Sequence, residues 1–127
     1  MENVSRNDVV KMMDFCINKW GMSKFHDSLP KLRVYSRPPK DEPETYGYFN
    51  EDSNIIIVYI KPHKSMLDIC DTIIHEYTHY LQDIIGMYGV YLYKYKRNYS
   101  NHPYEVTAFN RGEKYRQQCL DTISSPK

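Results

Sequence analysis

The chain has 127 residues, with 17 Lys and Arg against 16 Asp and Glu, and a pI near 7.7. This length predicts a single domain, residues 1–127, large enough to bury a core without disulfide support. The near balance of charge gives no electrostatic reason to expect nucleic acid or an anionic membrane as a partner. With 41% apolar and 26% charged residues, the composition is typical of a folded globular protein.

The sequence shows no pattern typical of a secretory signal, a membrane span or a disulfide framework. The first 13 residues lack the apolar core of a secretory signal, and the longest apolar run, 55–60, is too short to span a membrane. Cys16, Cys70 and Cys119 are far apart and form no CxxC pair, so neither a disulfide framework nor a sulfur-ligated zinc site is expected. We therefore expect a cytoplasmic protein with reduced, buried thiols.

The first half of the chain predicts one helix and three strands. Apolar residues recur at helical spacing over 5–19, and Gly21 is a natural end for that helix. Residues 31–36 alternate as a half-buried strand does, and three prolines then mark 37–44 as a loop. Residues 45–49 and 54–60 flank a polar turn and predict a hairpin. The run 54–60, continuously apolar from residue 55 on, should lie inside the sheet, and 45–49, which contains a glycine, at its edge.

The second half predicts two helices. Ser65 is a suitable N-cap for a helix in which apolar residues repeat at helical spacing as far as Ile84, with Gly86 as its end. Residues 87–101 are rich in tyrosine and are ambiguous between a loop and a short irregular strand. Pro103 then begins a last helix that runs to about residue 120. The predicted order, α-β-β-β-α-α, is that of a small α+β domain.

The sequence HEYTH in the first of these helices is an HExxH motif. Residues four apart lie on one face of a helix, so the imidazoles of His75 and His79 can reach a single metal ion. Glu76 lies about 100° further round and can approach the same ion without being a ligand. Residues such as Ile73 and Tyr77 centre on the opposite side. The helix therefore has one face for the core and one for a metal, and zinc is the ion expected.

A hydrolytic zinc site has three protein ligands and one open position. The metzincin continuation of HExxH is absent, because Gln82 and Ile85 occupy its glycine and histidine positions. The third ligand must therefore come from elsewhere, and Glu105, in the first turn of the last helix, is our first choice. Small residues on its face, Ala108 and Gly112, would let the two helices approach closely. The alternatives are His102, Asp83, His63, Glu113 and His26.

An HExxH helix followed by a glutamate on the next helix resembles the gluzincin branch of the zincin metallopeptidases, and the length resembles its minimal single-domain members. The resemblance covers about residues 31–118, although only HEYTH is highly specific. It implies a zincin-like fold with a hairpin edge strand above the cleft and a zinc-dependent peptidase activity. Larger gluzincins often have Asp four residues after the glutamate, where this chain has Phe109. Asn110, Asp71 or Asp83 would then have to support a ligand histidine.

The mechanism that this site implies is amide hydrolysis by a water molecule from which Glu76 removes the proton. An extended peptide could pair with the expected edge strand, next to Gly47, Tyr48 and Phe49. The developing oxyanion usually needs a further donor. Candidate donors for it are Tyr95, Tyr99, His102 and Tyr104.

Two other functions compete with this one. The segment YKYKRNY, 93–99, interleaves basic and aromatic residues and could contact single-stranded nucleic acid. SprT-like DNA-associated proteases also have HExxH, but they resemble this chain less because their third ligand is a histidine, and we do not expect nucleic acid as a partner. The chain could also be a non-catalytic zinc-binding domain with a regulatory or interaction role. The presence of Glu76 argues against that reading, because a structural site has no use for a general base.

Overall fold

The computed structural model describes residues 4–82 and 103–124. These residues form three helices and three strands, and the predicted α+β class and element order are confirmed. Residues 87–101, for which the sequence was ambiguous, lie outside the described part. No helix in that part is both long and apolar enough to cross a bilayer. In chain order the elements are α1 (Arg6–Trp20), β1 (Lys31–Tyr35), β2 (Gly47–Asn50), β3 (Ile55–Tyr59), α2 (Met66–Leu81) and α4 (Pro103–Ser124).

The sheet is mixed, with strand order β1-β3-β2. β3 pairs in parallel with β1 and antiparallel with β2. The prediction that the continuously apolar run lies in the middle of the sheet is confirmed, and Ile56 and Val58 of β3 are fully buried. The prediction of an edge strand formed by the first arm of the hairpin is also confirmed, with β2 shorter than the expected 45–49 run.

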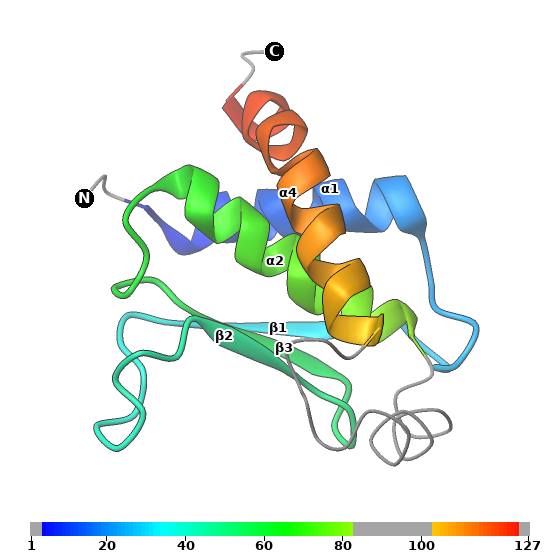
Figure 1. The fold of residues 1–127 in the computed structure, drawn as a ribbon, viewed down its shortest axis with the longest axis horizontal. Helices are drawn as coiled ribbons and strands as arrows, with labels where there is room; N and C mark the ends of the chain where they lie inside the picture. The colour runs from blue at the N-terminus through cyan, green and yellow to red at the C-terminus, as the bar shows by residue number, and fades with distance from the viewer. Residues whose placement is uncertain (1–3, 83–102, 125–127) are drawn as a thin grey trace.

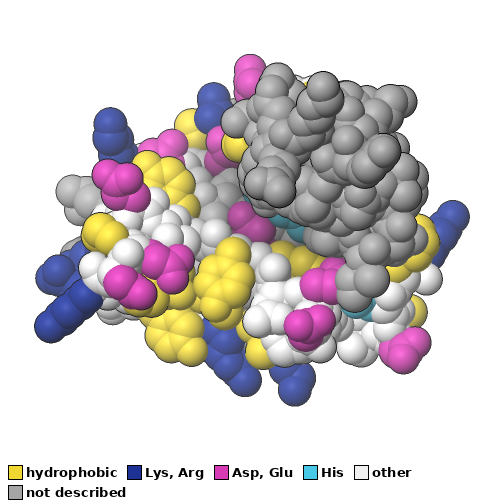
Figure 2. Space-filling view, turned by 60° about the horizontal axis from the view of Figure 1, so that its bottom comes forward, with side chains coloured by type: hydrophobic (Ala, Val, Ile, Leu, Met, Phe, Trp, Pro, Cys, Tyr) yellow, Lys and Arg dark blue, Asp and Glu magenta, His cyan; other side chains and the backbone are white. Residues whose placement is uncertain are grey.

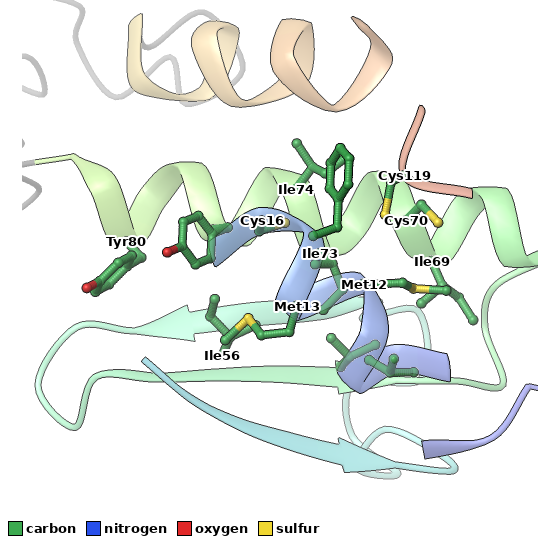
Figure 3. Packing of buried hydrophobic residues seen from close by; sticks show 14 residues of the cluster. Met12, Met13, Cys16, Ile56, Ile69, Cys70, Ile73, Ile74, Tyr80 and Cys119 are labelled. Atoms are coloured by element: carbon green, nitrogen blue, oxygen red, sulfur yellow. The ribbon is translucent and has the colours of Figure 1, made fainter. Parts of the chain in front are cut away.

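All three helices lie on one side of the sheet, and α2 lies between the sheet and α4 (Figure 1). Buried side chains of α1 and α2 pack on the inner residues of β3, and Cys119 of α4 reaches the same core (Figure 3). The three cysteines are free and buried, as expected. α2 therefore contacts the sheet on one side and α4 on the other, and it also contacts α1.

The ends of α1 are fixed as its sequence suggests. Ser5 is the N-cap, and it forms a capping box with Asp8, whose carboxylate accepts the Ser5 backbone N–H at 2.9 Å. Gly21 ends the helix with a positive φ of 73°, a conformation that costs glycine little. The Gly21 carbonyl accepts a hydrogen bond from the Tyr77 hydroxyl at 2.5 Å, which ties this turn to α2.

The predicted end of α2 is wrong. The apolar repeat continues through Ile84 to Gly86, but the helix ends at Leu81, and Gln82 leaves it with an extended backbone (φ −94°, ψ 152°). The reason is tertiary, because the Gln82 side chain bonds both to α2 and to the first turn of α4. The N-terminal end agrees with prediction, since the Ser65 hydroxyl accepts the Asp68 N–H at 3.2 Å.

Candidate metal centre

The face of α2 turned away from the core presents the two histidines of HExxH. His75 and His79 lie one helical turn apart, with ring centroids separated by 4.8 Å and their planes nearly perpendicular. Their Nε2 atoms are 3.2 Å apart. Most of the His79 side chain is buried, whereas His75 is more accessible. Both imidazoles therefore point to one place beside the helix.

Glu105, from the first turn of α4, completes the group. Its side chain is only 3% exposed, and its Oε1 atom lies 3.0 Å from His75 Nε2 and 3.1 Å from His79 Nε2. The expected close approach of the two helices occurs, since Ala108 and Gly112 are buried on the same face of α4. Among the described residues, His75, His79 and Glu105 are the group of three or more metal-ligating side chains whose ligand atoms converge.

The three distances fit a tetrahedral metal site. Zinc bonds of about 2.0–2.1 Å at tetrahedral angles place neighbouring ligand atoms about 3.3 Å apart. The separations of 3.0, 3.1 and 3.2 Å among the two Nε2 atoms and Oε1 are close to that value. Two imidazoles and one carboxylate are also a donor set that zinc accepts in catalytic sites. The residues present therefore fit the ion that the sequence predicts.

The electrostatics of His79 reflect its two acidic neighbours. Burial disfavours protonation of the imidazole, but the hydrogen bond with Glu105 and the negative charges of Glu76 and Glu105 outweigh it and raise the pKa of His79 above its ordinary value. A site that attracts a proton in this way also attracts a divalent cation, because both bind the same lone pairs.

Glu76 lies beside the group but is not part of it. It is 9% exposed, and burial raises its pKa to about 7, against the opposing influence of His75 and His79. The backbone N–H of Phe49 on β2 bonds to its carboxylate and favours the charged form. Glu76 is thus a carboxylate held between α2 and the edge strand, with a pKa suited to taking up and releasing a proton near neutrality.

A cavity of about 470 Å³ opens beside this carboxylate. Its floor is one face of α2, because its α2 residues, 68, 71, 72, 75 and 76, follow helical spacing. Tyr46, just before β2, and Phe109 of α4 line its sides. On the face shown in Figure 2, a histidine and an acidic side chain lie next to each other near the middle of the view, with hydrophobic side chains nearby. The remaining lining residues are Lys64, Asp68, Asp71, Thr72, His75 and Glu76.

Of the other candidates for a third ligand, those that the structure describes do not join the group. His63 is buried, and its ring nitrogens bond to the Tyr59 carbonyl at 2.8 Å and the Thr72 hydroxyl at 2.7 Å. His26 lies 3.5 Å from Glu51, and Glu113 is exposed on α4. His102 and Asp83 lie outside the described residues, as do the proposed oxyanion donors Tyr95 and Tyr99. Tyr104 directly precedes Glu105 and is half-buried.

The residues expected to contact a substrate belong to β2. A Cβ at Gly47 would lie 2.5 Å from the Ile57 carbonyl oxygen and 3.2 Å from Thr72 Cγ2, so this glycine lets the edge strand pack closely on its neighbours. Tyr48 is exposed, and Phe49 contributes the backbone N–H that bonds to Glu76. Gly47 thus has a packing role in addition to any contact with a substrate.

Among the described residues, the contacts of the ligand histidines differ from those that the sequence suggested, and Asp83 lies outside those residues. Phe109 packs its ring on His75, with centroids 4.6 Å apart, while Asp71 accepts a hydrogen bond from Arg116 at 3.2 Å and Asn110 is exposed. The residue that sequence reasoning missed is Gln82, whose Oε1 lies 2.8 Å from His79 Nδ1. The sequence signal that could have identified Gln82 is its position three residues after His79, where a polar side chain on a helix can reach the histidine ring.

No known family model, curated protein or solved structure matches this chain.

Proposed function

We propose that this protein is a zinc-dependent metallopeptidase with a zincin-like fold and the ligand set of a gluzincin. The observation that supports it most is the convergence of His75, His79 and Glu105 on one point, with the buried carboxylate of Glu76 beside it. A structural zinc site normally uses four protein ligands, and three ligands, the number that the described residues bring together, leave a position for substrate or water. The general base next to that position favours hydrolysis.

The chemistry divides between the ion and the chain. A zinc ion bound there supplies Lewis-acid chemistry, polarising a carbonyl group and lowering the pKa of a water molecule to about 7. Glu76 accepts the proton of the attacking water and then delivers it to the amine that leaves. The Phe49 N–H orients the Glu76 carboxylate, and burial raises the pKa of that carboxylate to about 7, which makes it a better acceptor for the proton of the water.

Among the described strands, β2 pairs with β3 on one edge only, and its other edge supports a peptide as the substrate. The Tyr46 carbonyl accepts the Tyr59 N–H at 3.0 Å, so alternate residues of β2 bond to β3 and the backbone groups of Gly47 and Phe49 point away from it. The bond from the Phe49 N–H to Glu76 fits this alternation. An extended peptide that pairs with this edge would lie next to Glu76, held by main-chain hydrogen bonds that tolerate many sequences.

The test compares the full-length, zinc-loaded protein with its Glu76→Gln variant on a mixed peptide library, with bound zinc measured in both. We expect wild type to cleave, and Glu76→Gln to retain zinc but lose about 10²-fold or more of the activity. Glu113→Gln, which alters an exposed glutamate of α4, is the matched control and should cleave as wild type does. Equal activity in wild type and Glu76→Gln would refute the mechanism.

The same experiment, together with a nucleic-acid binding assay, separates the competing functions. A wild-type protein that binds zinc stoichiometrically but cleaves nothing would be a non-catalytic zinc-binding domain. Binding to single-stranded nucleic acid that weakens steeply with salt would indicate a nucleic-acid partner. The segment 93–99, on which that alternative rests, lies outside the described residues.

A further inference from the structure

One side chain joins the two helices that provide the metal-ligating group. Gln82 caps the C-terminal end of α2, and its backbone N–H donates to the His79 carbonyl at 3.1 Å. Its side chain turns back, so that Oε1 lies 2.8 Å from His79 Nδ1, while Nε2 donates to the Tyr104 carbonyl at 3.1 Å. Tyr104 directly precedes Glu105. A single amide thus contacts a ligand histidine and the backbone next to the ligand glutamate.

The hydrogen-bond chemistry fixes which way this amide points. A backbone carbonyl can only accept, so the atom of Gln82 that faces Tyr104 must be the NH₂ group. The oxygen then faces His79, and since an amide oxygen can only accept, His79 must carry its proton on Nδ1. In neutral His79, Nε2 consequently has no proton, and its lone pair points towards His75 Nε2 and Glu105 Oε1.

We propose that Gln82 is a positioning residue that holds His79 in the metal-binding tautomer and fixes the first turn of α4 so that Glu105 meets it. The inference rests on the metal site of the proposed function. The opposite tautomer would place a proton on Nε2, between the three ligand atoms, and would have to be exchanged before a cation could bind. Mutation of a residue that hydrogen-bonds to a ligand histidine typically weakens metal binding by about 10–100-fold.

The first test measures the tautomer directly on the full-length, metal-free protein. On the alkaline plateau of the His79 titration, where the ring is neutral, imidazole ¹⁵N chemical shifts distinguish the Nδ1–H form from the Nε2–H form. We expect His79 to be the Nδ1–H form in wild type and a mixture of both forms in Gln82→Met, which has a similar length but no amide. Gln118→Met, at an exposed glutamine of α4, is the control and should match wild type. An Nε2–H form in wild type would overturn the proposal.

The second test separates the two contacts by zinc affinity. Gln82→Glu keeps an oxygen that accepts from His79 Nδ1–H but loses the donor to Tyr104. We expect Gln82→Met to bind zinc about 10–100-fold more weakly than wild type, and Gln82→Glu to recover much of that loss. Circular dichroism verifies that each variant is folded. Equal affinity in wild type and Gln82→Met would overturn the positioning role.

Failure of the proposed function gives a different pattern. If wild type binds no zinc, or binds it and cleaves no peptide, the peptidase proposal fails. The tautomer of metal-free His79 is measured independently of both, so it still decides whether Gln82 sets the protonation of that ring. An unchanged tautomer in Gln82→Met would reject the role of Gln82 even in an active peptidase.

Discussion

Gly112 of α4 packs directly against Asp71 of α2, so closely that a Cβ at position 112 would overlap the Asp71 carboxylate. The Asp71 carbonyl oxygen would lie 3.2 Å from the same Cβ. Position 112 is two turns along α4 from Glu105 on the same face, so this contact sets how near the glutamate can come to His75 and His79. The absence of a side chain at 112 is therefore a condition for the geometry of the metal-ligating group.

Gly112→Ala should push α4 away from α2. We expect a net loss of stability of up to about 2 kcal/mol, because overpacking costs about 1–3 kcal/mol and the better helix propensity of alanine returns about 1 kcal/mol. The zinc affinity should fall as well, since Glu105 moves with its helix. Urea denaturation and a zinc titration measure the two effects.

The closest obstacle at Gly112 is a side chain, which makes the explanation testable by rescue. Asp71→Ala removes the carboxylate, so the double variant Gly112→Ala, Asp71→Ala should lose less than the sum of the two single variants. Asn110→Ala, on the exposed side of α4, changes helix propensity without a clash and should not weaken zinc binding. Strict additivity in the double-mutant cycle would show that Asp71 is not the obstacle.

Gly47→Ala should destabilise the protein without a comparable rescue. The new Cβ would meet the Ile57 carbonyl oxygen at 2.5 Å, and backbone cannot move aside as a side chain can. We expect a loss of about 1–3 kcal/mol in urea denaturation. Thr72→Ser removes the other close atom, Cγ2 at 3.2 Å, but keeps the hydroxyl that bonds to His63. Full recovery in the double variant with Thr72→Ser would place the obstacle in Thr72 instead of Ile57.

The elements that the sequence predicted well are those with strong local signals. The uninterrupted run at 55–60 identified the central strand, and the spacing of His75 and His79 identified the face of α2 opposite the core. Ala108 and Gly112 on the face of Glu105 predict close helix packing, and these two residues are buried there.

The features that sequence reasoning missed depend on contacts between distant residues. The apolar pattern through Ile84 predicted a longer α2, but Gln82 leaves the helix where its side chain bonds to α4, 22 residues away at Tyr104. Gly47 was noted as a possible substrate neighbour, and its packing against Ile57 and Thr72 could not be derived from local sequence. Local helix propensity cannot predict a hydrogen bond that forms only after two helices have packed together.

His63 predicts a loss of stability in mild acid. Its ring is buried, donates from Nδ1 to the Tyr59 carbonyl and accepts at Nε2 from the Thr72 hydroxyl. Burial lowers its pKa below the ordinary value, although backbone contacts and the charges of Asp68 and Asp71 oppose this. The unfolded chain therefore binds more protons, and stability falls as pH drops below about 6.5, towards the lower folded pKa.

The measurement is the urea midpoint of wild type and His63→Asn at several pH values between about 7 and 5. Asparagine retains a donor for the Tyr59 carbonyl but does not titrate, so the variant should be less stable near pH 7 and should lose less on acidification. The difference between the two curves isolates His63 from other groups that titrate in this range. Parallel curves would show that His63 does not contribute to the acid sensitivity.

Zinc should stabilise the folded protein through Glu105 and not through acidic residues of α4 in general. A ligand that binds only the native state adds about 2.7 kcal/mol at a concentration 100 times its Kd. We expect this gain in wild type and in Glu113→Gln, whose altered side chain is exposed, and a much smaller gain at the same zinc concentration in Glu105→Gln. Glutamine keeps the shape of Glu105 but replaces a charged oxygen ligand by a neutral amide. Each variant is compared with itself in excess chelator, so a change in its metal-free stability cancels. An equal gain in Glu105→Gln and Glu113→Gln would mean that the cation binds without Glu105, and the two histidines would then require another partner.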